Sequence, residues 1–228
     1  MNYIIWNNKN SNTIQGLIIG ELPPITKPQM RVTETIVDGV DGSVIEELGY
    51  ESYDKTIAIG LKAGADIDSI MEYFTGNGDI VFSNEPNKVY KARIIQRIDY
   101  TRLLRYRTAS VTFRVQPFKY AYQEEEIAGT SSITVTNGGN CIAKPIITIT
   151  GSGIVTLKVN GSPVCQYTFP SGDTTVMIDS EKQDAYYGST LKNRNMVGEF
   201  PSLAKGENTI SCDGSVSKIS IKRYSRWL

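Results

Sequence analysis

Histidine is missing from this sequence of 228 residues. Its absence excludes Ser-His-Asp and Cys-His catalytic sites and the usual zinc and non-haem iron sites, which rely on imidazole. Cysteine is scarce, because Cys141, Cys165 and Cys212 are the whole complement and none forms a C-x-x-C pair. We therefore expect reduced, buried thiols, and the sequence indicates neither a metal site nor a cofactor.

Long apolar runs and an excess of charge are also lacking. No stretch approaches the ~20 apolar residues that cross a bilayer, and Met1-Asn2-Tyr3 opens without the basic and apolar regions of a signal peptide. The 24 Lys and Arg residues balance the 24 Asp and Glu residues, so the total charge does not indicate a nucleic-acid coat protein. We expect no membrane insertion and no signal peptide.

The clearest element that is present is a strand at residues 109–120. Its apolar side chains alternate with polar ones, which is typical of a half-buried strand. The apolar ones are Ala109, Val111, Phe113 and Val115. Pro117 lacks an N–H and is expected to end the pairing. The acidic and polar residues that follow predict a linker near 120–131, and hence domains at 1–125 and 130–228.

The first half is predicted to be an antiparallel β-sandwich or split barrel with one α-helix. Ile67, Ile70, Met71 and Phe74 share one helical face, with Asp66 as the cap. Short β-prone segments surround this helix, and further strands are expected at 89–95 and around 98–104. In the second half, seven or eight short strands with turns such as Asn160-Gly161 predict a β-sandwich or jelly roll.

Charge in the first half is sorted by segment. Residues 32–54 carry a net charge of −7, from Glu34, Asp38, Asp41, Glu46, Glu47, Glu51 and Asp54. Residues 91–119 carry a net charge of +7, because they contain one acidic residue, Asp99, and eight basic ones: Lys91, Arg93, Arg97, Arg102, Arg105, Arg107, Arg114 and Lys119. One interpretation is two solvated faces whose charges add little. The other is an acidic arm that reaches the basic strands of the next subunit.

Three chemical functions are alternatives for parts of this sequence. The basic stretch with Tyr100 and Tyr106 is compatible with single-stranded nucleic-acid binding, although no RNA-binding or phosphate-binding motif accompanies it. Paired carboxylates suffice for a glycosidase, yet Glu124–Glu126 lie in the expected linker. Asp38 and Asp41 lack the spacing of a calcium loop and favour turns. We assign no catalytic residue and no metal ligand.

A carbohydrate-binding module is the main alternative function. Aromatic residues of the second half are candidates for stacking on sugars, or else for packing in the core. They are Tyr167, Tyr186, Tyr187, Phe200 and Trp227.

Four motifs, in this order and spacing, carry a family resemblance across nearly the whole chain. They are Val37–Ser43, Phe113–Tyr120, Asn137–Asn140 followed by Ala143-Lys144-Pro145, and Gly198–Pro201 with Gly206-Glu207-Asn208. In these motifs the sequence resembles the distal tail protein family of long, non-contractile phage tails and related prophages.

The resemblance implies a ring of six copies at the tail tip. The N-terminal domain would close the ring with an arm at about residues 31–50, and the C-terminal domain would be a galectin-like β-sandwich. The implied partners are further copies of the chain, the tail tube protein, the tail-associated lysin or spike and a receptor-binding protein, with DNA only passing through the bore. Such a protein is a non-catalytic virion component that is made in the host cytoplasm.

Overall fold

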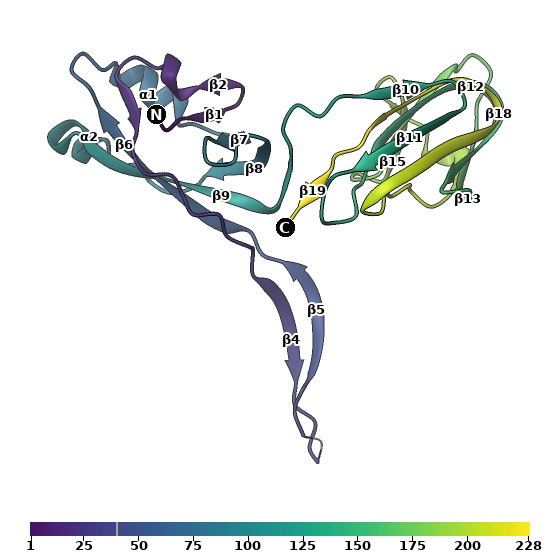
Figure 1. Cartoon of the computed structure of the whole chain (residues 1–228), viewed down its shortest axis with the longest axis horizontal. Coiled ribbons are helices and arrows are strands. Elements are labelled where there is room, and N and C mark those ends of the chain that lie inside the picture. Colours follow the sequence, from purple (N-terminus) through teal and green to yellow (C-terminus); the bar gives the residue numbers. More distant parts are fainter. Residues whose placement is uncertain (40) are drawn as a thin grey trace. The chain divides into compact units, whose positions relative to one another are not determined.

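The computed structural model describes residues 1–39 and 41–228, so Val40 of the Val37–Ser43 motif lies outside the described residues. The chain divides into two compact units (Figure 1). The first comprises residues 1–122 and 228, and the second residues 123–227. Each unit has its own apolar core. Among the described helices, none is long and apolar enough to cross a membrane.

The first unit is an antiparallel sheet with two α-helices and a projecting hairpin. Its sheet strands run in the spatial order β2-β1-β7-β8-β9-β6-β3. They are β1 (Ile4–Trp6), β2 (Lys9–Asn10), β3 (Leu17–Ile19), β6 (Tyr53–Leu61), β7 (Asn77–Phe82), β8 (Lys88–Ile94) and β9 (Thr108–Ala121), and a short 3-10 turn, η1 (Ser11–Thr13), follows β2. The hairpin consists of β4 (Met30–Thr35) and β5 (Val44–Tyr50).

The predicted helix is present as α1 (Ile67–Tyr73). Asp66 caps it, since its carboxylate accepts hydrogen bonds from the Ser69 hydroxyl and from the Ser69 amide, and these bonds hold the pKa of Asp66 below its usual value. The predicted apolar face is wrong at one position. Met71 is exposed, whereas Tyr73, which was not predicted for this face, is buried. The Tyr73 hydroxyl donates a hydrogen bond to the Lys9 carbonyl.

The strand predicted around residues 98–104 is wrong, because this segment forms a second helix, α2 (Tyr100–Tyr106). Asp99 caps it by accepting a hydrogen bond from the Arg102 amide at 2.8 Å. Arg107 ends it in the left-handed region with φ 62°. Leu103 is the helix residue that is buried, so one turn of apolar contact and two caps outweigh the β-prone composition.

Strand β9 confirms the buried face predicted for residues 109–115 but extends past Pro117 to Ala121. Its pairing with β8 is irregular at this point, where Tyr90 pairs with Lys119 but Ala92 pairs with Val115. A proline is tolerated at such a bulge because its missing N–H costs no regular ladder bond. Pro117 therefore marks an irregularity within the strand and does not terminate it.

The second unit is a β-sandwich built around two long strands, β12 (Ile146–Val159) and β18 (Gly206–Lys222). One half of each strand joins a layer with β11 (Ser132–Asn137), β13 (Ser162–Thr168) and β17 (Met196–Gly198). The other half joins β10 (Ile127–Gly129), β14 (Thr175–Asp179), β15 (Asp184–Tyr187) and β16 (Thr190–Leu191). A 3-10 turn, η2 (Asn193–Asn195), precedes β17, and β19 (Arg226–Trp227) ends the unit.

The long strands change layer at glycines. Gly214 has φ +108°, and the β12–β18 register shifts between Thr150 and Gly151 and again between Ser152 and Thr156. A Cβ on Gly151 would lie 2.4 Å from the Ser215 carbonyl oxygen. Segments that the sequence presents as four short strands are therefore two continuous ones with a bend. The predicted mainly β fold with a C-terminal sandwich is confirmed.

Asn137 of the Asn-Gly-Gly-Asn motif organises the turn that follows β11. Although it is buried, its amide donates to the Cys141 carbonyl at 3.0 Å and to the Leu203 carbonyl at 3.1 Å. Its Oδ1 accepts from the Gly139 amide at 2.9 Å. The motif thus closes one end of the sandwich.

Replacing Asn137 with Ala is expected to lower the free energy of unfolding of the second unit by about 2–4 kcal/mol. The substitution removes all three bonds and leaves buried backbone groups unpaired, at ~1–3 kcal/mol each. Urea denaturation of the full chain measures the loss, and Thr134→Ala, at an exposed position on β11, is the control. Equal midpoints for the two variants would show that Asn137 has no such role.

The expectation of buried thiols holds for Cys165 and Cys212, where burial raises the pKa to about 11 and about 12. It is wrong for Cys141, which is only partly buried.

Candidate interaction surfaces

The β4–β5 hairpin, called the arm below, extends away from the sheet of the first unit (Figure 1). Its two strands pair with each other from Met30–Tyr50 to Thr35–Val44. At its root, Tyr50 stacks edge-on against Phe118 with ring centroids 6.1 Å apart. The Glu51 amide also donates to the Gln29 carbonyl at 2.9 Å. The arm is thus fixed where it leaves the sheet.

Apolar side chains of the arm lie in solvent on both of its faces. Ile36 is 80% exposed and Ile45 is 61% exposed, and the remaining members of this group are Val32, Val37, Val44 and Leu48. A two-stranded hairpin is marginally stable in water by itself. An arm with this much exposed apolar surface is expected to be covered by another protein surface.

The acidic residues predicted for the arm are exposed beside these apolar side chains. Glu34, Glu46 and Glu47 lie on the two strands, Asp38 and Asp41 lie near the tip, and Glu51 lies at the root. Glu34 accepts a hydrogen bond from Ser43 across the hairpin at 2.5 Å. The arm therefore combines apolar and negative groups.

The basic residues predicted to face such an arm are mostly not on strands. Arg93 lies on β8 and Arg97 on the connection that follows it, whereas Arg102 and Arg105 lie on α2 and Arg107 ends that helix. All five are exposed. The interpretation of a basic strand is therefore wrong, and the positive charge is presented chiefly by a short helix.

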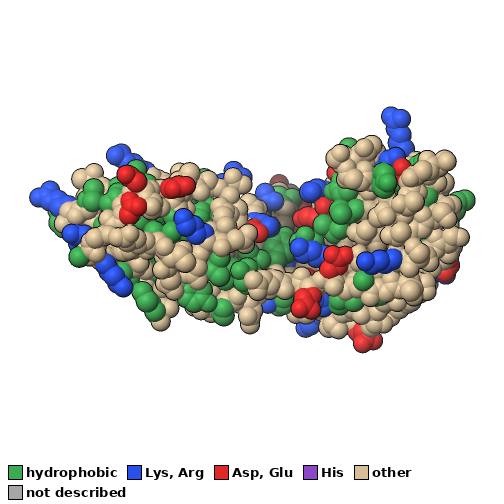
Figure 2. Space-filling view, turned by 90° about the horizontal axis from the view of Figure 1, so that it is seen from above, with side chains coloured by type: hydrophobic (Ala, Val, Ile, Leu, Met, Phe, Trp, Pro, Cys, Tyr) green, Lys and Arg blue, Asp and Glu red, His purple; other side chains and the backbone are tan. Residues whose placement is uncertain are grey.

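Helix α2 also exposes apolar groups, with Leu104 at 55% and Tyr106 at 63%. The Arg105 guanidinium lies 5.4 Å from the centroid of the Tyr106 ring. A hollow of about 470 Å³ is lined by Asp99, Thr101, Arg102, Arg105 and Tyr106. In Figure 2, basic side chains gather at the end of the first unit that carries α2. We call Arg102, Leu104, Arg105, Tyr106 and Arg107 the α2 surface.

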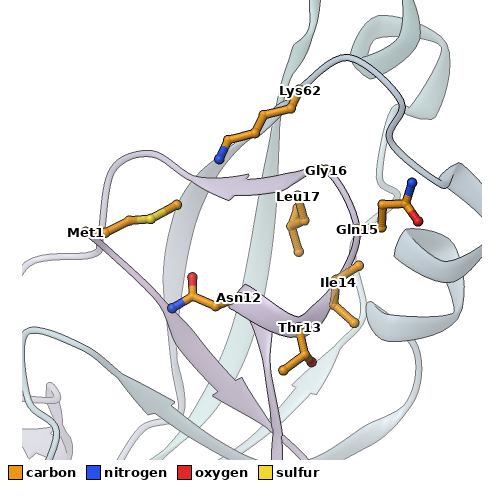
Figure 3. Close-up of a pocket in the computed structure, with 8 residues that line it drawn as sticks. All are labelled: Met1, Asn12, Thr13, Ile14, Gln15, Gly16, Leu17 and Lys62. Atoms are coloured by element: carbon orange, nitrogen blue, oxygen red, sulfur yellow. The ribbon is translucent and has the colours of Figure 1, made fainter.

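A second hollow, of about 440 Å³, lies near the N-terminus (Figure 3). Its lining residues are Met1, Asn12, Thr13, Ile14, Gln15, Gly16, Leu17 and Lys62. Lys62 is the one residue among them with an ionisable side chain. Over the residues that the structure describes, no cluster of His, Cys, Asp or Glu could hold a metal ion.

The aromatic residues proposed for sugar stacking are not equivalent. Tyr167 is 1% exposed and packs edge-on against Phe169 at 4.9 Å, so it belongs to the core and cannot stack on a sugar. Tyr186 and Trp227 are partly buried, and Tyr186 donates to Asp179 at 3.2 Å. Tyr187 is exposed beneath the Lys192 amine, which lies 5.9 Å from its ring centroid. Sugar binding by Tyr186, Tyr187 and Trp227 stays a prediction.

Sequence comparison finds no matching family model and no matching curated protein. The structure, in contrast, is similar over its whole length to the crystal structure of the Dit (gp 19.1) protein of phage SPP1. The likeness has a TM-score of 0.72 at 14% identity and covers 100% of both chains. This chain has the fold of a phage distal tail protein. A chain of the phage p2 baseplate in its activated conformation is also similar, with a TM-score of 0.48 at 9% identity over 96% of this chain.

The distal tail protein fold includes both units, because the SPP1 likeness leaves no part of either chain uncovered. The resemblance stated from the sequence motifs is therefore supported at the level of the fold. The sequence pattern located the acidic residues of the arm and the three arginines of the α2 surface, but it missed the helix that carries them and the exposed Leu104. The Asp99 cap and the spacing of Tyr100, Leu103 and Leu104 are the signals that could have found that helix.

Proposed function

We propose that this chain is a distal tail protein that forms a sixfold ring at the tip of a phage or prophage tail. The observation that carries the proposal is the end-to-end likeness to SPP1 Dit, a protein described as a paradigm of the hub adsorption apparatus in phages that infect Gram-positive bacteria. A likeness that includes both units favours the same structural role over a shared single module.

The arm and the α2 surface supply the two patches that a ring needs. A head-to-tail ring requires two different, complementary surfaces on each subunit. The arm presents negative charge with exposed Ile36 and Ile45, and the α2 surface presents positive charge with exposed Leu104 and Tyr106. In our proposal the arm of each copy covers the α2 surface of the next.

In this role the ring joins the tail tube protein on one side to the tail-associated lysin or spike on the other. Receptor-binding protein attaches to the assembled tip, and DNA passes through the bore as cargo. The protein itself carries out no catalysis and needs no cofactor. It is made in the host cytoplasm and resides in the virion.

Reversing the charge of the α2 surface tests the contact. We expect the triple variant Arg102→Glu, Arg105→Glu, Arg107→Glu to need at least tenfold more protein to form rings, because like charges then face the arm. Molar salt should weaken wild-type rings in the same direction, since it shortens the Debye length to about 3 Å. Mass photometry over a concentration series measures both effects.

A matched control reverses three exposed lysines of the second unit, Lys205, Lys218 and Lys222. This control changes the net charge equally and is expected to leave assembly unchanged. Rings that tolerate both the α2 charge reversal and molar salt would show that the arm contacts a different surface.

A further inference from the structure

Lys55 is a lysine at a position where the fold calls for an apolar side chain. Strand β6 alternates, and its inward-facing residues are Lys55, Ile57, Ile59 and Leu61. Lys55 is 2% exposed. It belongs neither to the arm nor to the α2 surface. Burial of an ammonium group is costly unless the protein supplies partners for it.

The partners of Lys55 are aromatic faces and one backbone carbonyl. Its amine lies 5.0 Å from the ring centroid of Tyr90 and 5.7 Å from those of Tyr53 and Phe82. Three ring faces compensate in part for the lost water. The amine donates one hydrogen bond, of 2.8 Å, to the carbonyl of Pro24. This bond joins the sheet to the segment that leads into the arm.

The ionisable groups around the amine come from three further elements. Glu85, in the turn between β7 and β8, accepts from Lys119 of β9 at 2.6 Å and from the Tyr90 hydroxyl of β8. Burial lowers the pKa of Lys55 to about 8, the nearby Glu85 carboxylate opposes this shift and Lys119 adds to it. Burial also raises the pKa of Tyr53, on β6 itself, to about 12.

The segment that Lys55 holds is short and directly joined to the arm. Residues 21–29 have no regular secondary structure and connect β3 to β4. Pro23 and Pro28 are buried, and the amide of Asn84 donates to the Pro23 carbonyl at 2.9 Å. Two successive carbonyls, of Pro23 and Pro24, are thus held by side chains, and Pro28 limits backbone rotation at one position between them and Met30.

We propose that Lys55 is a positioning residue that sets the direction in which the arm leaves the sheet. A methionine of similar length would fill the same space without the cost of burying a charge, and such replacements are often neutral or stabilising. A lysine at this position therefore serves the geometry of the arm root at the expense of sheet stability. Its consequence for assembly rests on the proposed function, whereas its effect on the arm root does not.

The test compares Lys55→Met with Lys62→Met, an exposed lysine just beyond the same strand. Hydrogen–deuterium exchange is followed in the full chain at the Glu51 amide, which donates to the Gln29 carbonyl at the arm root. For Lys55→Met we expect about tenfold faster exchange there, because a charge-assisted hydrogen bond is lost. Protection of β6 and β9 and the melting temperature should be unchanged or higher. Lys62→Met should match wild type throughout, and Lys55→Arg should restore much of the protection.

The outcomes separate the two proposals. Faster exchange at the arm root with weaker ring assembly supports both. Faster exchange in a protein that forms no ring even as wild type supports the role of Lys55 and contradicts the proposed function. Unchanged exchange at the Glu51 amide in a folded Lys55→Met variant overturns the role of Lys55.

Should Lys55→Met fail to fold, the wild-type protein supplies the test through pH. The folded-state pKa of Lys55, about 8, lies below its ordinary value of 10.5. The amine therefore becomes neutral in the folded protein as pH rises through 8, and protection of the Glu51 amide should then fall after correction for intrinsic exchange. Over the same interval this group makes the fold more stable, since the unfolded chain binds more protons. Constant protection from pH 7 to 9.5 would overturn the proposal.

Discussion

Excision of the arm will leave a folded protein that no longer forms rings. The variant replaces residues 31–49 with Asn-Gly, which joins the paired residues Met30 and Tyr50 by a two-residue hairpin turn. The removed residues have no share in the buried core of the first unit, so its fold should survive. The removed segment does contain the exposed Ile36 and Ile45, and its loss leaves the ring without one of its two patches.

Native mass spectrometry and circular dichroism together measure this result. We expect only the monomer mass for the excised variant at concentrations where wild type assembles, with an unchanged β spectrum. The control replaces residues 36–43 with Asn-Gly between the paired residues Thr35 and Val44, and so keeps both arm strands. It should form rings more weakly than wild type but not lose them. Rings of normal mass without the arm would contradict the role given to it.

The second large effect is expected in the core of the first unit. Phe113 is fully buried, and its ring lies 5.3 Å from that of Trp6, 6.2 Å from Phe82 and 6.4 Å from Phe74. These rings come from the sheet and from the end of α1. Phe113→Ala is therefore expected to lower the free energy of unfolding of this unit by about 3–5 kcal/mol.

Because each unit has its own core, the loss should be confined to one of them. Urea denaturation followed by tryptophan and far-ultraviolet signals should show an early transition for the first unit and an unshifted one for the second. Phe118→Ala on the same strand is the matched control, since Phe118 is only partly buried and should cost about 1 kcal/mol. Equal shifts of both transitions would mean that the two units unfold together.

Local patterns in the sequence predicted the elements whose burial alternates in a simple way. The face formed by Val111, Phe113 and Val115 follows directly from period-2 alternation, and Asp66 caps α1 as expected. The Asn160-Gly161 step forms the predicted β12–β13 turn with positive φ at both residues.

The remaining features depend on contacts between distant residues. Tyr167 shares the inward face of β13 with Cys165, which places its ring in the core, but no local signal separates a core tyrosine from a binding one. Two predicted strands are one continuous strand, β12, with a bend at Gly151. The sequence could not show this, because the close approach of Gly151 to Ser215 is set by the pairing of β12 with β18. Lys55 is similar, since only the folded sheet brings Tyr90 and Pro24 to its amine.

The mass of the assembled wild-type chain tests the central claim most directly. Native mass spectrometry of the purified protein across a concentration series, with negative-stain imaging of the same samples, gives both copy number and shape. Our account predicts a species of six times the 25.2 kDa chain that images as a ring with an open centre. A folded chain that remains monomeric at high concentration, and also when mixed with the tail tube protein and the lysin or spike, would contradict it.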